Sequence, residues 1–94
     1  MDKARIRVDF NELIEPDLVL LSKTDIVEDS DGNSIELTTG KIISIYEFNE
    51  YVDGEKEYLL AEGIAELNNP ANNGEWTRIV KWCCRINHKG ISVE

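Results

Sequence analysis

The chain has 94 residues, 41% of them hydrophobic, and a formal net charge of −9. This size and composition predict one folded domain over residues 1–94 and exclude a disordered chain, and the longest apolar run, Leu18 to Leu21, is far shorter than the roughly 20 residues that span a bilayer. The acidic charge disfavours nucleic acid and anionic lipid, and it suits either solubility alone or a basic protein partner.

The first predicted strand covers residues 4–10, where apolar and charged side chains alternate. A period of two predicts that one face is buried, while the other face, with Arg5 and Arg7, meets water. The segment has no continuous apolar stretch and is therefore not a signal peptide, so we expect a cytoplasmic protein without a membrane partner. One short helical turn is expected near residues 11–15, before Pro16.

Residues 17–22 form the next predicted strand, which is apolar on both faces. Asp31-Gly32 then predicts a hairpin turn between two short strands. The acidic side chains around this turn suggest calcium, but the first ligand and the bidentate glutamate of an EF-hand loop are missing. A turn is the better interpretation, and no metal site is predicted.

Residues 41–48 predict a strand that places Ile42, Tyr46 and Phe48 on one face, and Ile43 and Ile45 on the other. The sequence Asp53-Gly54 predicts a second hairpin turn. Residues 56–67 contain strong helix formers, yet their apolar side chains fit one face of a strand better than one face of a helix. We therefore expect a strand there and keep a helix as the alternative.

A loop over residues 68–75, a strand over 76–87 and a short last strand over 91–94 complete the chain. Six or seven short strands predict an all-β protein, with a small antiparallel β-barrel as its architecture. The segment "LTTGKIISIYE" (37–47) resembles the part of SH3-like barrels in which a glycine introduces a core strand. This resemblance implies an SH3-like or related barrel and no particular ligand.

Strands 17–22 and 41–48 are apolar on both faces, whereas one face of an antiparallel barrel strand should meet water. A second copy of the chain could cover the second face, which predicts a homodimer. The candidate interface residues are Val19, Leu21, Ile43, Ile45 and Trp76. The alternative is that a curled barrel covers this face with its own Leu13, Ile14 and a loop.

The segment "KWCCRIN" (81–87) places two cysteines side by side. Neighbouring strand residues point to opposite faces, so Cys84 should pack in the core beside Trp82. Cys83 would then lie on the outer face between Lys81 and Arg85, and this makes it a candidate reactive thiol.

Nothing in the sequence forms a convincing catalytic or cofactor site. His88 is the only histidine, no glycine-rich phosphate loop is present, and the serines lack a nucleophile motif. We expect no enzyme activity and no cofactor. The expected function is protein–protein interaction, starting with self-association.

Three alternatives stay open. An acidic inhibitor or immunity-type protein would bind a basic protein target through its charged face. A barrel with a hollow mouth would bind a small ligand. A basic patch formed by both ends of the chain would bind RNA, although cross-strand pairs with Glu62 and Glu66 would neutralise that patch. Its members are Lys3, Arg5, Arg7, Lys81 and Arg85.

Overall fold

The computed structural model describes all 94 residues, which form nine strands and three single helical turns. In chain order these are β1 (Ile6–Arg7), η1 (Phe10–Glu12), β2 (Leu13–Glu15), β3 (Leu18–Ser22), β4 (Ile26–Glu28), β5 (Ser34–Glu36), β6 (Ile42–Glu50), β7 (Lys56–Leu67), α1 (Pro70–Asn73), η2 (Glu75–Thr77), β8 (Trp82–Ile86) and β9 (Ser92–Val93). The prediction of an all-β protein is confirmed. The predicted six or seven strands are too few, since the chain forms nine. The prediction of at most one helical turn is also too low, because the loop after β7 contains two further turns, α1 and η2.

Seven strands make one curled sheet in the order β1-β6-β7-β8-β3-β2, with β9 also paired to β7, and β4 and β5 form a separate hairpin. Strands β1 and β6 run parallel, and the other pairs are antiparallel. The end strands β1 and β2 do not pair. The all-β part of the predicted small antiparallel barrel is present, but hydrogen bonds do not close the sheet into a barrel. β1 ends after two residues, and Asp9 then caps η1. The chain therefore passes from β1 to β2 through η1, and no ladder of hydrogen bonds joins these two strands.

The main core lies inside the curl of the sheet, and β4 and β5 pack against it through Val27 and Ile35. Its twelve buried residues are Ile6, Val8, Phe10, Val19, Leu37, Ile43, Ile45, Ala61, Ala65, Trp82, Cys84 and Ile86. The predicted inward faces of residues 4–10 and of Trp82 and Cys84 agree with this core. At about 0.8 kcal/mol for each buried methylene group, burial of these side chains is the main stabilising contribution.

A second, smaller core on the outer face of the sheet explains why residues 17–22 are apolar on both sides. Val19 faces the main core, whereas Leu18 and Leu20 pack with Cys83 beneath Ile14 and Val80. Strand β2 and the segment before β8 thus cover β3 from outside. The covering is intramolecular, as the alternative with Ile14 and a loop predicted.

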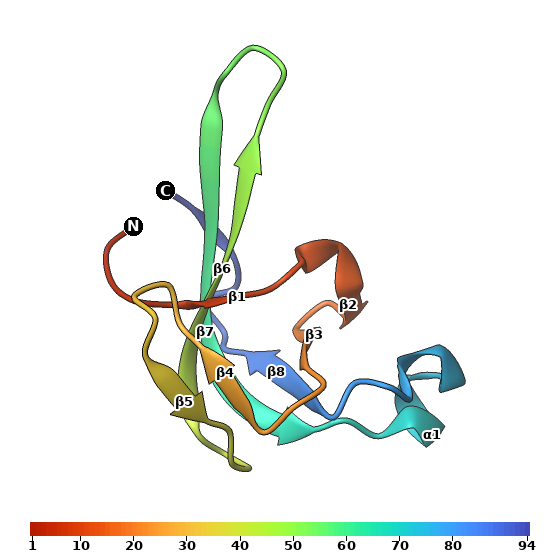
Figure 1. Cartoon of the computed structure of the whole chain (residues 1–94). Coiled ribbons are helices and arrows are strands. Elements are labelled where there is room, and N and C mark those ends of the chain that lie inside the picture. Colours follow the sequence, from red (N-terminus) through yellow and green to blue (C-terminus); the bar gives the residue numbers. More distant parts are fainter.

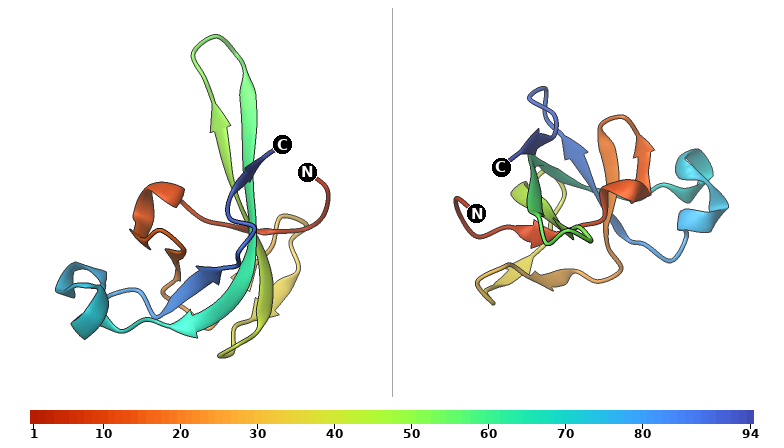
Figure 2. Two further views of the ribbon diagram at one scale, coloured as in Figure 1. Left: turned by 180° about the vertical axis from the view of Figure 1, so that it is seen from behind. Right: turned by 90° about the horizontal axis from the view of Figure 1, so that it is seen from above.

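The β6–β7 hairpin is the longest element and projects beyond the rest of the molecule (Figure 1). β7 is a strand over Lys56–Leu67, so the helix alternative is wrong. The turn closes where Tyr51 donates its N–H to the carbonyl of Glu55, and Gly54 takes a φ of 87°. We call residues 47–58 the arm. The view from behind shows the same projecting arm (Figure 2, left).

The acidic β4–β5 turn is held by its own side chain. One Asp29 carboxylate oxygen accepts the N–H groups of Asp31 and Asn33 at 2.9 and 3.0 Å. Gly32 follows with a φ of 82°, a conformation that glycine adopts without strain. The predicted hairpin turn is therefore present, and Asp29 acts as its cap.

Candidate interaction surfaces

The predicted interface is wrong for most of its residues. Val19, Ile43 and Ile45 are at most 4% exposed and belong to the main core, and Leu21 packs half-buried against it. The two faces of β6 are the reverse of the prediction, since Ile42 is 81% exposed. Trp76 is exposed, but it lies in η2 at the end of the loop after β7 and not beside the others.

The predicted exposure of Cys83 is also wrong. Its side chain is fully buried in the smaller core, where its Sγ lies 3.7 Å from Asn68 Oδ1. Burial, reinforced by the nearby Glu66 charge, raises the pKa of the Cys83 thiol to about 11. Burial likewise raises the pKa of Cys84 to about 12. Both thiols are therefore protonated at neutral pH, and Cys83 has neither the access nor the thiolate that reactivity requires.

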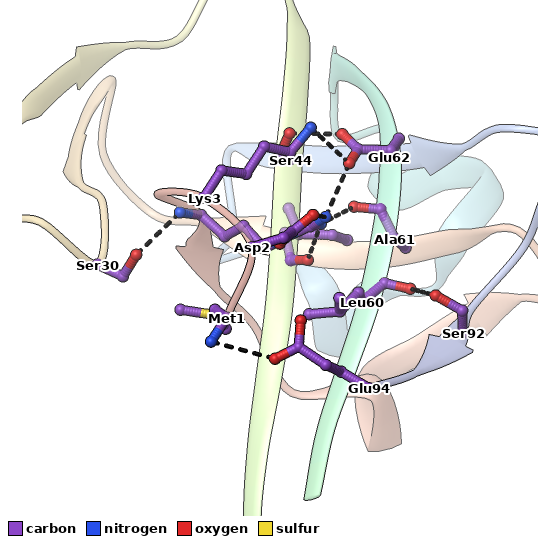
Figure 3. A network of polar contacts seen from close by, with 12 residues as sticks. Met1, Asp2, Lys3, Ser30, Ser44, Leu60, Ala61, Glu62, Ser92 and Glu94 are labelled. Carbon is purple, nitrogen blue, oxygen red and sulfur yellow. Dashed lines mark hydrogen bonds and ion pairs between the residues drawn. The ribbon is translucent and has the colours of Figure 1, made fainter.

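A polar network ties the N-terminal segment to β6 and β7 (Figure 3). Arg5 belongs to this network. Its guanidinium donates to the carbonyls of Ile45 and Ala61 at 3.1 Å. It also contacts Asp2 at 2.9 Å and Glu62 at 3.0 Å. With a side chain only 4% exposed, Arg5 fastens the sheet and is not available to a ligand.

The other residues of the predicted basic patch are mostly neutralised. Lys3 pairs with Glu62 at 2.9 Å, and Lys81 pairs with Asp25 at 2.7 Å. Arg85 contacts Glu66 across the β7–β8 ladder, as predicted, and also contacts Glu15 and Asp17 from the β2–β3 turn. Of this predicted patch, only Arg7 remains without an ion pair.

The arm and the sheet beneath it carry a cluster of aromatic side chains. Phe48 and Tyr58 are register partners whose rings lie 5.0 Å apart, and Tyr46 lies 6.4 Å from Tyr58. All three side chains are half-buried by one another and by their strands. At the tip, Tyr51 and Val52 are 49% and 110% exposed. We call Tyr46, Phe48 and Tyr58 the aromatic face.

Acidic side chains lie on both faces of the arm: Glu50 is on the aromatic face opposite Lys56, whereas Glu47 and Glu57 are on the other face. Residues 47–58 contain one basic residue, Lys56, and none of the five arm carboxylates makes an ion pair. These carboxylates belong to Glu47, Glu50, Asp53, Glu55 and Glu57. The hydrogen bond from Tyr51 to Glu57, at 2.9 Å, raises the pKa of the Tyr51 hydroxyl. The arm is therefore an anionic surface with exposed rings.

The largest hollow, of about 620 Å³, lies between the β4–β5 hairpin and the ends of β7 and β8. The Asp25 carboxylate lies in this hollow and accepts hydrogen bonds from the Lys81 ammonium group and, at 2.9 Å, from the Trp82 indole N–H. These two hydrogen bonds, from Lys81 first, lower the pKa of Asp25. The polar groups of this hollow thus satisfy one another and do not converge on an empty centre. No group of three or more His, Cys, Asp or Glu side chains is arranged to hold a metal ion.

The sequence contains an indication of the arm. Tyr46, Phe48 and Tyr58 were each visible in a strand, and the Asp-Gly turn fixed their pairing. The prediction named Ile43 and Ile45 as interface residues and left Tyr46 and Phe48 on the opposite face of the strand. The glutamates that alternate with these aromatic residues near the turn indicate that this end of the hairpin leaves the core.

No helix of the chain is long and apolar enough to cross a membrane. No protein-family model, no curated protein and no solved structure matches the chain.

Proposed function

We propose that the chain is a non-enzymatic protein-interaction module whose arm binds a basic segment of a partner protein. The observation that carries this proposal is the half-buried aromatic face on an arm whose five carboxylates make no ion pair. An inhibitor of a basic target protein is one form that such a module would take. The partner is recognised by its Lys and Arg side chains.

Two contributions favour a basic partner over other ligands. Lys and Arg cations interact favourably with the faces of Tyr and Phe, by about 0.5–1 kcal/mol at exposed sites. The carboxylates of the arm attract the same cations and speed their encounter with it. The same charges repel phosphates and anionic membranes. Charge and ring chemistry at the arm thus select one class of partner.

The proposal is tested with a ten-residue peptide of alternating lysine and threonine, whose binding is measured by fluorescence anisotropy at low salt. The variant E50Q/E55Q/E57Q removes three arm charges. The control variant E28Q/D31N/E36Q removes three charges from the β4–β5 hairpin, where these side chains also lack ion pairs. Both variants have the same net charge.

We expect the arm variant to bind the peptide about tenfold more weakly, because three exposed ion pairs contribute roughly 0.2–1 kcal/mol each. The hairpin control should lose much less affinity. Equal losses in the two variants would show that the peptide senses only the net charge, and this result would defeat the proposal. A separate Tyr58→Leu variant, which keeps every charge, should also bind the peptide more weakly than the wild type, because it lacks the ring.

A second candidate function is self-association at a site different from the buried one. Ile42 and Ile64 are direct register partners that are 81% and 40% exposed. They line a hollow of about 340 Å³ together with Ile86. Sedimentation equilibrium at high micromolar concentration would detect a dimer, and Ile42→Lys should return that dimer to monomer. A monomer at all concentrations would exclude this candidate.

For the architecture, we also propose an SH3-like relationship over residues 37–47. Gly40 takes a φ of 84° two residues before β6 begins, which fits a glycine that introduces a core strand. An experimental structure compared strand by strand with SH3-like barrels would test this. A different strand order around β6 would contradict it.

A further inference from the structure

The outer edge of β6 is open along the arm. On this side Val8 donates its N–H to the carbonyl of Tyr46 at 2.8 Å, and this is the last backbone bond that the N-terminal segment makes to β6. Backbone groups of alternate strand residues point to the same edge, so Phe48 and Glu50 direct their N–H and C=O groups outward as well. No backbone hydrogen bond reaches them from that side.

The N-terminal segment leaves the edge because a side chain replaces the next backbone bond. The Phe10 N–H bonds to the carboxylate of Glu47 at 2.7 Å instead of continuing the ladder. Asp9 caps η1 at this point and turns the chain away. The edge beyond Tyr46 is therefore left without a partner.

The opposite edge of the hairpin is better covered. Strand β9 pairs with Leu59 and Leu60 of β7, and Glu94 donates its N–H to the carbonyl of Tyr58 at 2.9 Å. A bound segment would find continuous free edge on β6 rather than on β7.

A hollow of about 270 Å³ lies directly beside the open edge. Phe48 and Asn49 of β6 form one wall, and residues 7–11 form the other. Its charged side chains are the carboxylates of Asp9 and Glu47 and the cation Arg7. The hollow gives room next to the edge for the side chains of another strand.

We infer that the basic segment binds as an added β-strand along Phe48–Glu50 of β6. Its backbone pairs with the open edge, and its side chains alternate between the aromatic face and the hollow. Charge complementarity selects the occupant, since the five arm carboxylates oppose a second acidic copy of this chain and favour a Lys- or Arg-rich segment. The inference rests on the proposed function and adds the mode of binding to it.

A single substitution at residue 50 distinguishes the contribution of the backbone edge from that of the Glu50 side chain. Glu50→Pro removes the outward N–H of residue 50, and proline is tolerated at an edge position whose N–H faces solvent. The β6–β7 bonds run through the alternate residues and stay intact. Glu50→Ala removes the same carboxylate but keeps the N–H, so it is the matched control.

We expect Glu50→Pro to bind the lysine–threonine peptide about five- to thirtyfold more weakly than Glu50→Ala, the loss that one or two kcal/mol produces. Equal affinities for the two variants would overturn the added-strand mode. Backbone amide NMR spectra of β7 confirm that both variants keep the hairpin.

A second measurement uses the unchanged protein and does not depend on the folding of a variant. The same peptide with every backbone amide N-methylated keeps its charges but cannot donate to a strand. The added-strand mode predicts that only the unmodified peptide binds tightly, and that it slows hydrogen exchange of the Phe48 and Glu50 amides. Equal binding of both peptides supports a basic partner and excludes the added strand. If neither peptide binds, the proposed function itself fails.

Discussion

Arg5 shows how one residue can depart from the pattern of its strand. Its neighbours Ile6 and Val8 are buried as the alternation predicts, yet Arg5 is buried as well. The guanidinium has five donors in a fixed fork, and acceptors from Asp2, Ile45, Ala61 and Glu62 surround it. Three of these lie 40 or more residues away in the chain, so no local pattern could reveal them.

Removal of the Arg5 side chain should therefore cost far more stability than a surface charge. Arg5→Met keeps the apolar stem but leaves Glu62 without its buried partner, and we expect a loss of about 2–4 kcal/mol in the free energy of unfolding. Arg5→Lys keeps the charge without the fork and should lose less. Urea denaturation measures both variants. A loss below 0.5 kcal/mol for Arg5→Met, about the size of an ordinary surface effect, would contradict the anchoring role.

The same network gives this loss a definite pH dependence. The hydrogen bond from Arg5 lowers the pKa of Asp2 from 3.8 to about 2. Burial raises the pKa of Glu62, but Ser44, Lys3 and Arg5 outweigh it and the net shift is downward. A lowered pKa in the folded state stabilises the protein above the unfolded pKa, and this contribution disappears as pH falls through the folded value. The stability difference between wild type and Arg5→Met should thus shrink between about pH 4.5 and pH 2. A difference that stays constant over this range would contradict it.

At the scale of elements, the sequence predicted strands and turns better than faces. The predicted strands at 17–22 and 56–67, the two short strands around Asp31-Gly32 and both Asp-Gly turns are present. On β6, however, each face offered apolar side chains, so the alternation could not decide which was buried. The cross-strand partners decide it, because Ile43 and Ile45 face the small residues Gly63 and Ala61, which leave room for the core. The open edge depends on where the N-terminal segment turns away, which no local pattern encodes.

Gly63 provides the test of that close packing in β7. A Cβ atom at this position would lie 2.2 Å from the Arg85 carbonyl oxygen and 2.8 Å from Cys84 Sγ. Intrinsic preference predicts that Gly→Ala within a strand stabilises by about 0.5–1 kcal/mol. The clash with the β8 backbone predicts the opposite sign, a loss of about 1–3 kcal/mol for Gly63→Ala. Thermal denaturation decides between them, and any stabilisation would show that β8 can move away from β7.

For the whole molecule, composition predicted a single all-β chain but not its open shape. Closure of a sheet depends on pairing between strands at its two ends, and β1 and β2 are too short and too far apart in the sheet order to pair. The arm results from the lengths of the strands, since β6 and β7 are longer than the strands that cover them. Length differences of this kind place the aromatic face outside the core.

The distribution of charge leads to a prediction for the molecule as a whole. Eleven of the 19 carboxylates make no ion pair, whereas only five of the ten basic residues are unpaired. The folded chain therefore carries uncompensated self-repulsion. Sodium chloride raised from about 10 mM to about 150 mM shortens the screening length from roughly 30 to 8 Å. We expect the melting temperature to rise by about 4 °C, which corresponds to relief of roughly 1 kcal/mol in a domain of this size.

The two charge variants show where that repulsion is located. E50Q/E55Q/E57Q and E28Q/D31N/E36Q both lower the net charge from −9 to −6. If the repulsion is spread over the whole surface, the rise in melting temperature with salt should be reduced equally in both variants. The arm projects beyond the other elements (Figure 1), so its carboxylates should repel mainly one another, and the response of the arm variant should fall less. A melting temperature that decreases with salt in the wild type would mean that the nine ion pairs outweigh the repulsion, contrary to this expectation.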